Sequence, residues 1–393
     1  MIMKNIKIIL WLAVFVTLCA FTACAPKQQQ QEDETDFRVA PAEDGKSLVI
    51  TRYIGKKQVV SIPVRLYQFP VTAVGNEAFK DCELISVTIP GVITTIGNMA
   101  FAGNQLVSVV IGNGVTAIGD RAFFQNQLTS VDIPNSVTVI GEEAFQENKL
   151  TDVTIPNNVT AIGHNAFTGN KLTSVTIPAS VVSIGYSPFL LCPALTAINV
   201  SPDNKNYSSV DGVLYNKNIT ALIQWPAGKP GSAVIPDSVT SIARNAFNGG
   251  KLTNIVIPDS VTEIGTRAFR NNKLTAVTIG SGVTSIGDYA FQNNLLTDVI
   301  IPDNVSVIGI WAFNDNKLAS VTIGSGITSI GIGAFIENQI TSITIGANVP
   351  IDTNYYYNPS FGNDFEGDYR RSNRRAGTYT RPNTDSNSWT RKK

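Results

Sequence analysis

Residues 128–149 read LTSVDIPNSVTVIGEEAFQENK, and variants of this segment fill most of the chain. The phenylalanine of its Ala-Phe pair recurs every 22 residues in two series, which are separated by a gap of 58 residues. The series are Phe79, Phe101, Phe123, Phe145, Phe167 and Phe189, and then Phe247, Phe269, Phe291, Phe313 and Phe335. Eleven copies at a fixed spacing predict a repeat architecture in which each copy forms one coil.

The residue types along the segment predict how each coil folds back on itself. Val131 and Ile133 alternate with polar residues, which indicates a short strand with one buried face. Pro134 lacks an N–H group and ends the strand, and Gly141 allows a tight bend before Phe145. One coil cannot bury these apolar side chains alone, so we expect the coils to stack around one continuous core.

An asparagine lies three residues after most of these phenylalanines: Asn104, Asn126, Asn148, Asn170, Asn272, Asn294, Asn316 and Asn338. A buried asparagine in every coil can bond the free backbone groups of its neighbour, so we expect a hydrogen-bonded ladder. Cys82 and Cys192 occupy the same column, five coils apart, which makes a disulfide between them implausible. We therefore predict two small, buried thiols that replace asparagine and have no redox or metal-binding role.

The consensus L-T-x-V-T-I-P-x-x-V-T-x-I-G-x-x-A-F-x-x-N resembles the BspA-like leucine-rich repeat, a bacterial subclass found in surface proteins of host-associated organisms, including treponemes. The resemblance covers residues 71–349. It implies a leucine-rich-repeat solenoid of 22-residue coils, with a parallel β-sheet on one face, short turns or 3₁₀ segments on the other, and β-rich caps.

The N-terminus has the features of an export signal. Two lysines precede an apolar run over residues 8–18, which is too short to span a bilayer comfortably. The following FTAC at 21–24 resembles the lipobox of bacterial lipoproteins, which implies that residues 1–24 are a signal peptide and that Cys24 carries a lipid. The alternative is an ordinary secretory signal with an incidental cysteine. Residues 25–36, rich in Gln and acidic side chains, are predicted to be a flexible tether.

Three segments depart from the repeat. Residues 37–70 contain strand-like runs at 47–51 and 58–62, which predict a hairpin that caps the first coil. Within the solenoid, residues 199–231 form an insertion, where Asp211-Gly212 between apolar runs predicts a hairpin that stays stacked on the coils.

Residues 350–393 resemble the C-terminal segment of treponemal members and are predicted to be a cap followed by a basic tail. The last 24 residues contain one acidic residue, Asp385, and eight basic residues: Arg370, Arg371, Arg374, Arg375, Arg381, Arg391, Lys392 and Lys393. An exported protein rarely meets nucleic acid, so we expect no nucleic-acid partner. A solvated cap with a frayed tail is the main interpretation, and attraction to anionic glycans or to the bacterial envelope is the alternative.

The chain lacks the side chains that a catalytic centre requires. Its Lys+Arg and Asp+Glu counts are equal at 30 each, so no polyanionic partner follows from net charge. The only histidine, His164, occupies a slot that holds chemically unlike residues in other coils, which indicates an exposed bend. Asp203 and Asp211 lack the spacing of a calcium loop. We predict no enzyme activity, no cofactor and no metal site.

The outward strand positions are the candidate binding face: Ser130, Asp132, Asp152, Thr154, Ser174, Thr176, Asn254, Thr278, Asp298, Ser320 and Thr322. Strands stacked about 4.8 Å apart over the coils give a surface on the order of 50 Å long. This surface is neutral, shallow and rich in hydroxyl groups, which suits weak polar contacts with an extended macromolecule better than capture of a small substrate. The alternative is that these residues only make the sheet soluble.

These features predict an exported protein of the cell envelope, lipid-anchored in the outer membrane and exposed at the surface. Its expected role is binding or adhesion, with extracellular host proteins or surface glycans as partners and the membrane contacted through the N-terminal lipid. Host targets are implied by the family resemblance. The alternative is a structural or interbacterial component that contacts bacterial proteins or polysaccharide.

Replacement of Cys24 by alanine tests the lipid anchor. Because the thioether and the lipid need this sulfur, metabolic labelling with radioactive palmitate should mark the wild type and leave Cys24→Ala unlabelled. A mutant that still incorporates palmitate would show that the lipobox is assigned to the wrong cysteine.

Overall fold

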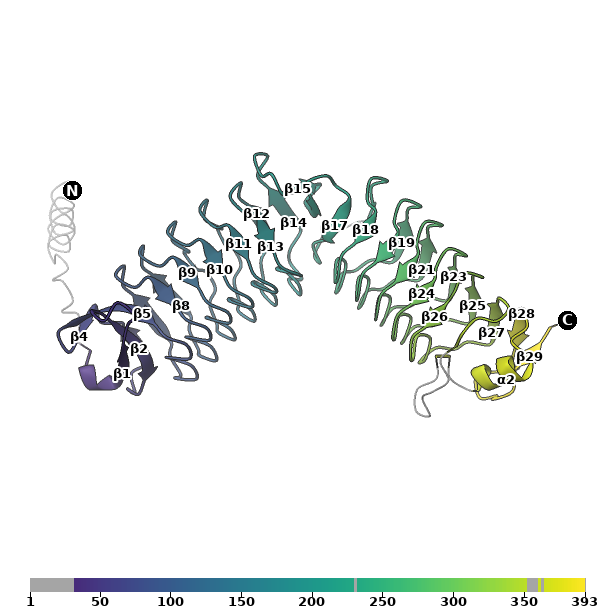
Figure 1. The fold of residues 1–393 in the computed structure, drawn as a ribbon, viewed down its shortest axis with the longest axis horizontal. Coiled ribbons are helices and arrows are strands. Elements are labelled where there is room, and N and C mark those ends of the chain that lie inside the picture. Colours follow the sequence, from purple (N-terminus) through teal and green to yellow (C-terminus); the bar gives the residue numbers. More distant parts are fainter. Residues whose placement is uncertain (1–31, 230–231, 352–359, 362–363, 393) are drawn as a thin grey trace, which may run out of the picture.

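The structure is a computed structural model that describes residues 32–229, 232–351, 360–361 and 364–392. The coils stack side by side into one long arc, with the two caps at its opposite ends (Figure 1). The predicted repeat solenoid, with 22-residue coils and parallel strands, is confirmed. The predicted signal peptide and most of the predicted tether lie outside the described residues.

Each regular coil has three sides, which we name the long-strand face, the short-strand face and the bend. The long strands carry four residues each: β6 (Ser86–Ile89), β8 (Ser108–Ile111), β12 (Ser174–Ile177), β14 (Ala197–Val200), β19 (Asn254–Ile257), β21 (Ala276–Ile279), β23 (Asp298–Ile301), β25 (Ser320–Ile323) and β27 (Ser342–Ile345). The bend follows the short strand and carries the Ala-Phe pair.

The short strands carry two residues each and form the more continuous ladders. They are β7 (Thr95–Ile96), β9 (Ala117–Ile118), β10 (Val139–Ile140), β11 (Ala161–Ile162), β13 (Ser183–Ile184), β18 (Ser241–Ile242), β20 (Glu263–Ile264), β22 (Ser285–Ile286), β24 (Val307–Ile308) and β26 (Ser329–Ile330). Threonines beside them reinforce the pairing, as where Thr138 Oγ1 donates to the carbonyl of Thr116 at 3.1 Å. Sequence patterning predicted the sheet of long strands and missed this second parallel ladder.

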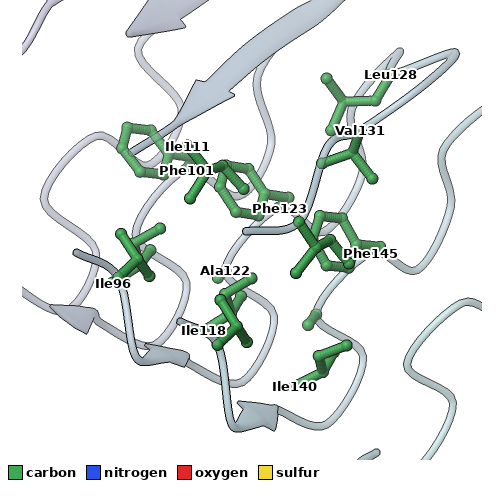
Figure 2. Packing of buried hydrophobic residues seen from close by; sticks show 14 of the residues in the cluster. Ile96, Phe101, Ile111, Ile118, Ala122, Phe123, Leu128, Val131, Ile140 and Phe145 are labelled. Atoms are coloured by element: carbon green, nitrogen blue, oxygen red, sulfur yellow. The ribbon is translucent and has the colours of Figure 1, made fainter. Parts of the chain in front are cut away.

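Stacked phenylalanines run along the core. The rings of Phe101 and Phe123 lie 5.3 Å apart and those of Phe123 and Phe145 lie 5.2 Å apart, nearly parallel in both pairs and fully buried. Figure 2 shows these three rings side by side, with Ile96, Ile118 and Ile140 in a second row near the short strands. Each ring thus covers the next, at a separation usual for favourable aromatic pairs.

The predicted asparagine ladder is confirmed. Asn148 Oδ1 accepts a hydrogen bond from the N–H of Leu128 at 3.1 Å, and its Nδ2 donates to the carbonyls of Phe123 at 2.8 Å and Phe145 at 3.2 Å. Cys192 takes the same place, where its thiol donates to the Phe167 carbonyl at 3.5 Å. Burial raises the pKa of Cys192 to about 11, so this thiol stays protonated. Cys82 and Cys192 are both free in the described structure. Cys192 is buried as predicted, whereas Cys82, in the first coil of the column, is only half-buried.

Gly141 serves a different purpose from the one the sequence suggested. Its φ is not positive, so the glycine is not required by the bend itself. A Cβ at this position would lie 2.6 Å from the carbonyl carbon of Gly119 and 2.7 Å from the amide nitrogen of Asp120. The glycine is therefore needed because the backbones of successive coils approach each other here.

The N-terminal cap differs from the predicted hairpin. β2 (Leu48–Tyr53) pairs antiparallel with β1 (Phe37–Pro41) and parallel with β5 (Phe69–Val74), while β3 (Val59–Ser61) pairs parallel with β6. A hairpin between 47–51 and 58–62 is therefore wrong: the two runs lie in different sheets because each follows the register of a coil. β4 (Arg65–Leu66) forms a small hairpin with β5. The solenoid thus begins before residue 71.

The end of the predicted tether is also folded. Residues Glu34–Asp36 form the short 3₁₀ helix η1, and Asp33 caps it by accepting from the N–H of Thr35. Glu32 pairs with Lys57 at 2.7 Å and accepts from the N–H of Ser61 at 3.0 Å. Residues 32–36 therefore belong to the cap, because their side chains bond groups that the sequence places far away.

The insertion forms the expected hairpin and adds a third strand. β15 (Tyr207–Val210), β16 (Val213–Asn216) and β17 (Ala221–Gln224) pair antiparallel in order. The turn at Asp211-Gly212 has φ of 50° and 73°, the left-handed pair that tight hairpins require. β17 then pairs parallel with β18, so the insertion stays stacked on the following coils as predicted.

The C-terminal cap is more ordered than predicted. α2 (Phe365–Arg371) precedes β28 (Gly377–Thr380), which pairs antiparallel with both β27 and β29 (Thr390–Arg391). Arg381 is buried, donates to the carbonyl of Ile340 at 2.6 Å and lies 4.9 Å from the ring centre of Trp389. The expected frayed tail is therefore wrong over residues 377–391, because strand pairing and this buried arginine hold the segment on the last coil.

Replacement of Asn148 by alanine should lower the free energy of unfolding of the solenoid by about 3 kcal/mol. The substitution leaves the buried N–H of Leu128 and the buried carbonyl of Phe123 without the hydrogen bonds that Asn148 makes to them. Urea denaturation monitored by circular dichroism measures the loss. Asn135→Ala, which removes an exposed asparagine side chain, is the control and should change stability by less than about 0.5 kcal/mol. Equal effects of the two substitutions would contradict a structural ladder.

Glu366 in the C-terminal cap should make stability fall as pH rises. Burial raises the pKa of Glu366 above its ordinary value of 4.5, although its carboxylate accepts from the N–H of Phe361 at 2.8 Å. Its ionised form is thus disfavoured in the folded state, and this penalty develops as pH rises from about 4.5 through the raised pKa. Glu366→Gln should lessen the fall in thermal midpoint between pH 4.5 and pH 7, and the exposed Glu337→Gln should not. A pH dependence that survives Glu366→Gln intact would refute the assignment.

Candidate functional site

The predicted binding residues lie where the strand alternation placed them. All are exposed except Thr322, which is half-buried. Their neighbours Val131, Val153 and Val175 point into the core and are almost fully buried. The long-strand face therefore presents the predicted side chains to solvent.

These residues do not form one unbroken sheet. The insertion separates an N-terminal group, Ser130 to Thr176, from a C-terminal group, Asn254 to Thr322. Within the first group, 130–133 and 152–155 keep the alternation of burial but are not paired as strands, whereas β12 pairs with β14. In the C-terminal group, β19 pairs with β21 and β23 pairs with β25, in two separate sheets. The face is thus divided by the insertion and is not one continuous sheet within either group.

A groove of about 730 Å³ lies in the N-terminal group, at the edge of the insertion. It gathers Asp152, Thr154, Ser174 and Thr176 from the predicted face. Ser201, Pro202 and Asp203, which follow β14, also line the groove and are named here its second wall; they are not among the predicted binding residues. The groove is therefore the place where the structure brings predicted residues together.

Asn204 holds the second wall in place. This residue is fully buried, and its Nδ2 donates to the carbonyls of Pro178 at 2.8 Å and Val181 at 3.0 Å. Its Oδ1 accepts from the N–H groups of Asn206 and Tyr207, both at 2.8 Å. The turn that carries Asp203 is thus fixed to the preceding coil. The signal available from sequence was the Ser-Pro-Asp-Asn turn placed directly after a long strand.

The groove has acidic and hydroxyl chemistry. Asp152 and Asp203 contribute carboxylates, and Ser174, Thr176 and Ser201 contribute hydroxyl groups, with no basic side chain in the lining. Carboxylates and hydroxyl groups at this kind of surface accept hydrogen bonds from amides, ammonium groups and sugar hydroxyls. The arrangement suits recognition of a polar or cationic segment.

His164 has a structural contact that sequence analysis did not foresee. Its Nδ1 accepts from the N–H of Tyr186 at 2.6 Å, and the two rings stack at 4.5 Å. Asp120 and Asp288 accept in the same way from the N–H of the next coil. His164 lies on the bend as predicted but is half-buried, because its ring stacks on that of Tyr186. Other coils carry Arg244, Ile310 or Ile332 at this position, which have no acceptor, so the contact is not required in every coil.

Asp211, on the hairpin turn of the insertion, forms an ion pair. Asp211 pairs with Lys229 at 2.9 Å. Within the described ranges, no group of three or more His, Cys, Asp or Glu side chains could hold a metal ion. In the same part of the chain, no helix is long and apolar enough to cross a membrane.

A family model described as the BspA type Leucine rich repeat region matches residues 72–207 and 234–361 in six copies. The match covers well over half of the chain. The chain belongs to this BspA type family. The resemblance inferred from the repeat consensus is confirmed.

Solved structures resemble this BspA type protein over most of its length. A leucine rich cell surface protein from Faecalibacterium prausnitzii is 30% identical, with a TM-score of 0.64 over 76% of this chain and 90% of the other. The pneumococcal vaccine antigen PcpA is 27% identical, with a TM-score of 0.67 over 77% and 85%. No curated protein sequence matches this BspA type protein.

Proposed function

We propose that this protein binds extracellular macromolecules at the cell surface, with the long-strand face as the contact surface and the groove at Asp152 and Asp203 as its centre. The groove carries the proposal, because it gathers four outward-facing residues of the repeat against a second wall that Asn204 holds rigid. Preorganised polar groups lose little entropy on binding. The partners are host proteins or surface glycans, and the role is adhesion.

The similarity to a protein described as a cell surface protein supports this location. A lipid on Cys24 would tether the solenoid to the outer membrane by its N-terminal end and leave the long-strand face accessible to a partner. In this proposal the solenoid is a binding scaffold without catalysis, the usual role of a leucine-rich-repeat solenoid. The alternative role, contact with envelope proteins or polysaccharide of the bacterium, would use the same face.

Two arginines placed in the groove test the proposal. Thr154→Arg/Thr176→Arg introduces bulk and positive charge at exposed positions of the long-strand face. The matched control, Val139→Arg/Val307→Arg, introduces the same groups at exposed positions of the short-strand face. Binding of the full-length protein to immobilised fibronectin, laminin, collagen and isolated bacterial envelope is measured by biolayer interferometry, with thermal midpoints as a check on folding.

We expect binding to at least one host protein, weakened tenfold or more by the groove variant and less than twofold by the control. Equal behaviour of the two variants would remove the long-strand face as the contact surface. Binding to bacterial envelope alone, or protection of the solenoid from protease added to intact cells, would replace adhesion by the structural role.

A further inference from the structure

A cluster of two arginines and two aromatic rings lies on the bend of three successive coils in the second half of the solenoid. Arg267 and Arg270 belong to one coil, Tyr289 to the next and Trp311 to the one after. The guanidinium carbons of Arg267 and Arg270 lie 5.2 Å and 5.9 Å from the ring centre of Tyr289. The ring centre of Trp311 lies 6.3 Å from that of Tyr289. We name these four residues the Arg-Tyr-Trp cluster.

In the first half of the solenoid, an arginine at the same bend position forms an ion pair. Arg121 occupies the same bend position as Arg267, since each lies two residues after the glycine that follows the short strand, Gly119 and Gly265 respectively. Its Nε lies 2.6 Å from the carboxylate of Glu143 in the next coil. In the second half, Tyr289 takes the place of Glu143. Arg267 therefore faces an aromatic ring where its counterpart faces a carboxylate.

The two guanidinium groups of the cluster lack an anionic partner. Among the described residues, neither Arg267 nor Arg270 has a carboxylate within 4.0 Å. The Nε atoms of both are shielded from solvent and have no hydrogen-bond acceptor, and Oε1 of Gln292 is likewise shielded and has no donor. Two like charges around one ring repel each other, and an aromatic face offsets only part of that cost. The arrangement is suited to binding an anion that contacts both guanidinium groups.

The rings beside the arginines provide a platform. Trp311 extends over the following coil, where a Cβ on Gly333 would lie 3.3 Å from its Nε1, so glycine leaves that space to the indole. Tyr289 and Trp311 are both half-buried, so part of each ring stays accessible. A flat aromatic surface can pack against the C–H face of a pyranose ring, while guanidinium forks bind carboxylate or sulfate in two-point contacts.

We propose that the Arg-Tyr-Trp cluster binds an acidic glycan, that is, a pyranose ring that carries a uronate or sulfate group. The anionic group binds Arg267 and Arg270, and the sugar ring lies against Trp311 and Tyr289. The cluster lies on the bend and not on the long-strand face. Ligand binding at the cluster is therefore independent of binding in the groove, and an experiment can disprove one site while supporting the other.

Direct binding of defined oligosaccharides to the purified full-length protein tests this assignment. The probes are heparin decasaccharide, which carries sulfate and uronate, hyaluronan decasaccharide, which carries uronate alone, and a neutral dextran of similar length. The variants are Arg267→Ala/Arg270→Ala, its charge-conserving form Arg267→Lys/Arg270→Lys, and Trp311→Ala. The matched control, Arg374→Ala/Arg375→Ala, removes two exposed charges from the C-terminal cap. Titration at 50 mM and 150 mM NaCl gives affinity and salt dependence.

We expect the wild type to bind at least one acidic decasaccharide and not dextran. The alanine double variant should bind tenfold or more weakly, the lysine variant should fall in between, and Trp311→Ala should lose at least about fivefold with its salt dependence unchanged. The cap control should stay within twofold, and unchanged thermal midpoints show that the variants fold.

Several results would overturn the proposal. Heparin binding that is lost in the cap control and kept in Arg267→Ala/Arg270→Ala would move the polyanion site to the cap. Oligothymidylate that binds as tightly as the glycans and responds to the same substitutions would reduce the cluster to a general polyanion site. Absence of binding to both acidic decasaccharides would remove the glycan assignment altogether.

Discussion

The hydrogen bonds of one asparagine per coil are the interaction on which the rest of the structure depends. Asn148 joins the N–H of Leu128 and the carbonyls of Phe123 and Phe145, so a single side chain satisfies backbone groups in neighbouring coils. Backbone hydrogen bonds also join successive bends, as where the N–H of Phe123 donates to the carbonyl of Ala144 at 2.8 Å, but they leave some buried groups unpaired, and such groups must be bonded. The asparagine bonds these remaining groups and therefore makes a tight bend compatible with a dry core.

Where this column is interrupted, the fold changes. Cys192 replaces asparagine at the last coil before the insertion, and the ring that would follow Phe189 is missing. Trp225 restarts the stack by lying 5.5 Å from Phe247. Hydrogen bonds outside the regular columns join the two sides of this junction, such as those from Gly228 N–H to the Leu195 carbonyl at 2.8 Å and from Asn245 Nδ2 to Ser187 Oγ at 3.0 Å. The solenoid is thus two regular stacks that meet at the insertion, and the groove forms at the edge of the first.

A rigid core leaves the outward positions free to vary. On the bend, the same position carries Arg121 opposite Glu143 in one half and Arg267 opposite Tyr289 in the other. Neither pair contributes to the core, so their difference has little effect on the fold. Surface chemistry can therefore differ between coils while the scaffold stays constant, which is how a repeat protein acquires separate sites along its length.

The sequence by itself determined the coil, its period, the buried columns and the exposed alternation at Ser174 and Thr176, because these follow from a local pattern repeated at every turn. It also identified the Asp211-Gly212 hairpin, whose turn chemistry is local. The short-strand ladder, the pairing of β3 with β6 and the buried Arg381 were decided only by tertiary structure, since each depends on a partner distant in the chain. The groove and the Arg-Tyr-Trp cluster belong to the same class: their residues come from different coils, and only stacking brings them together.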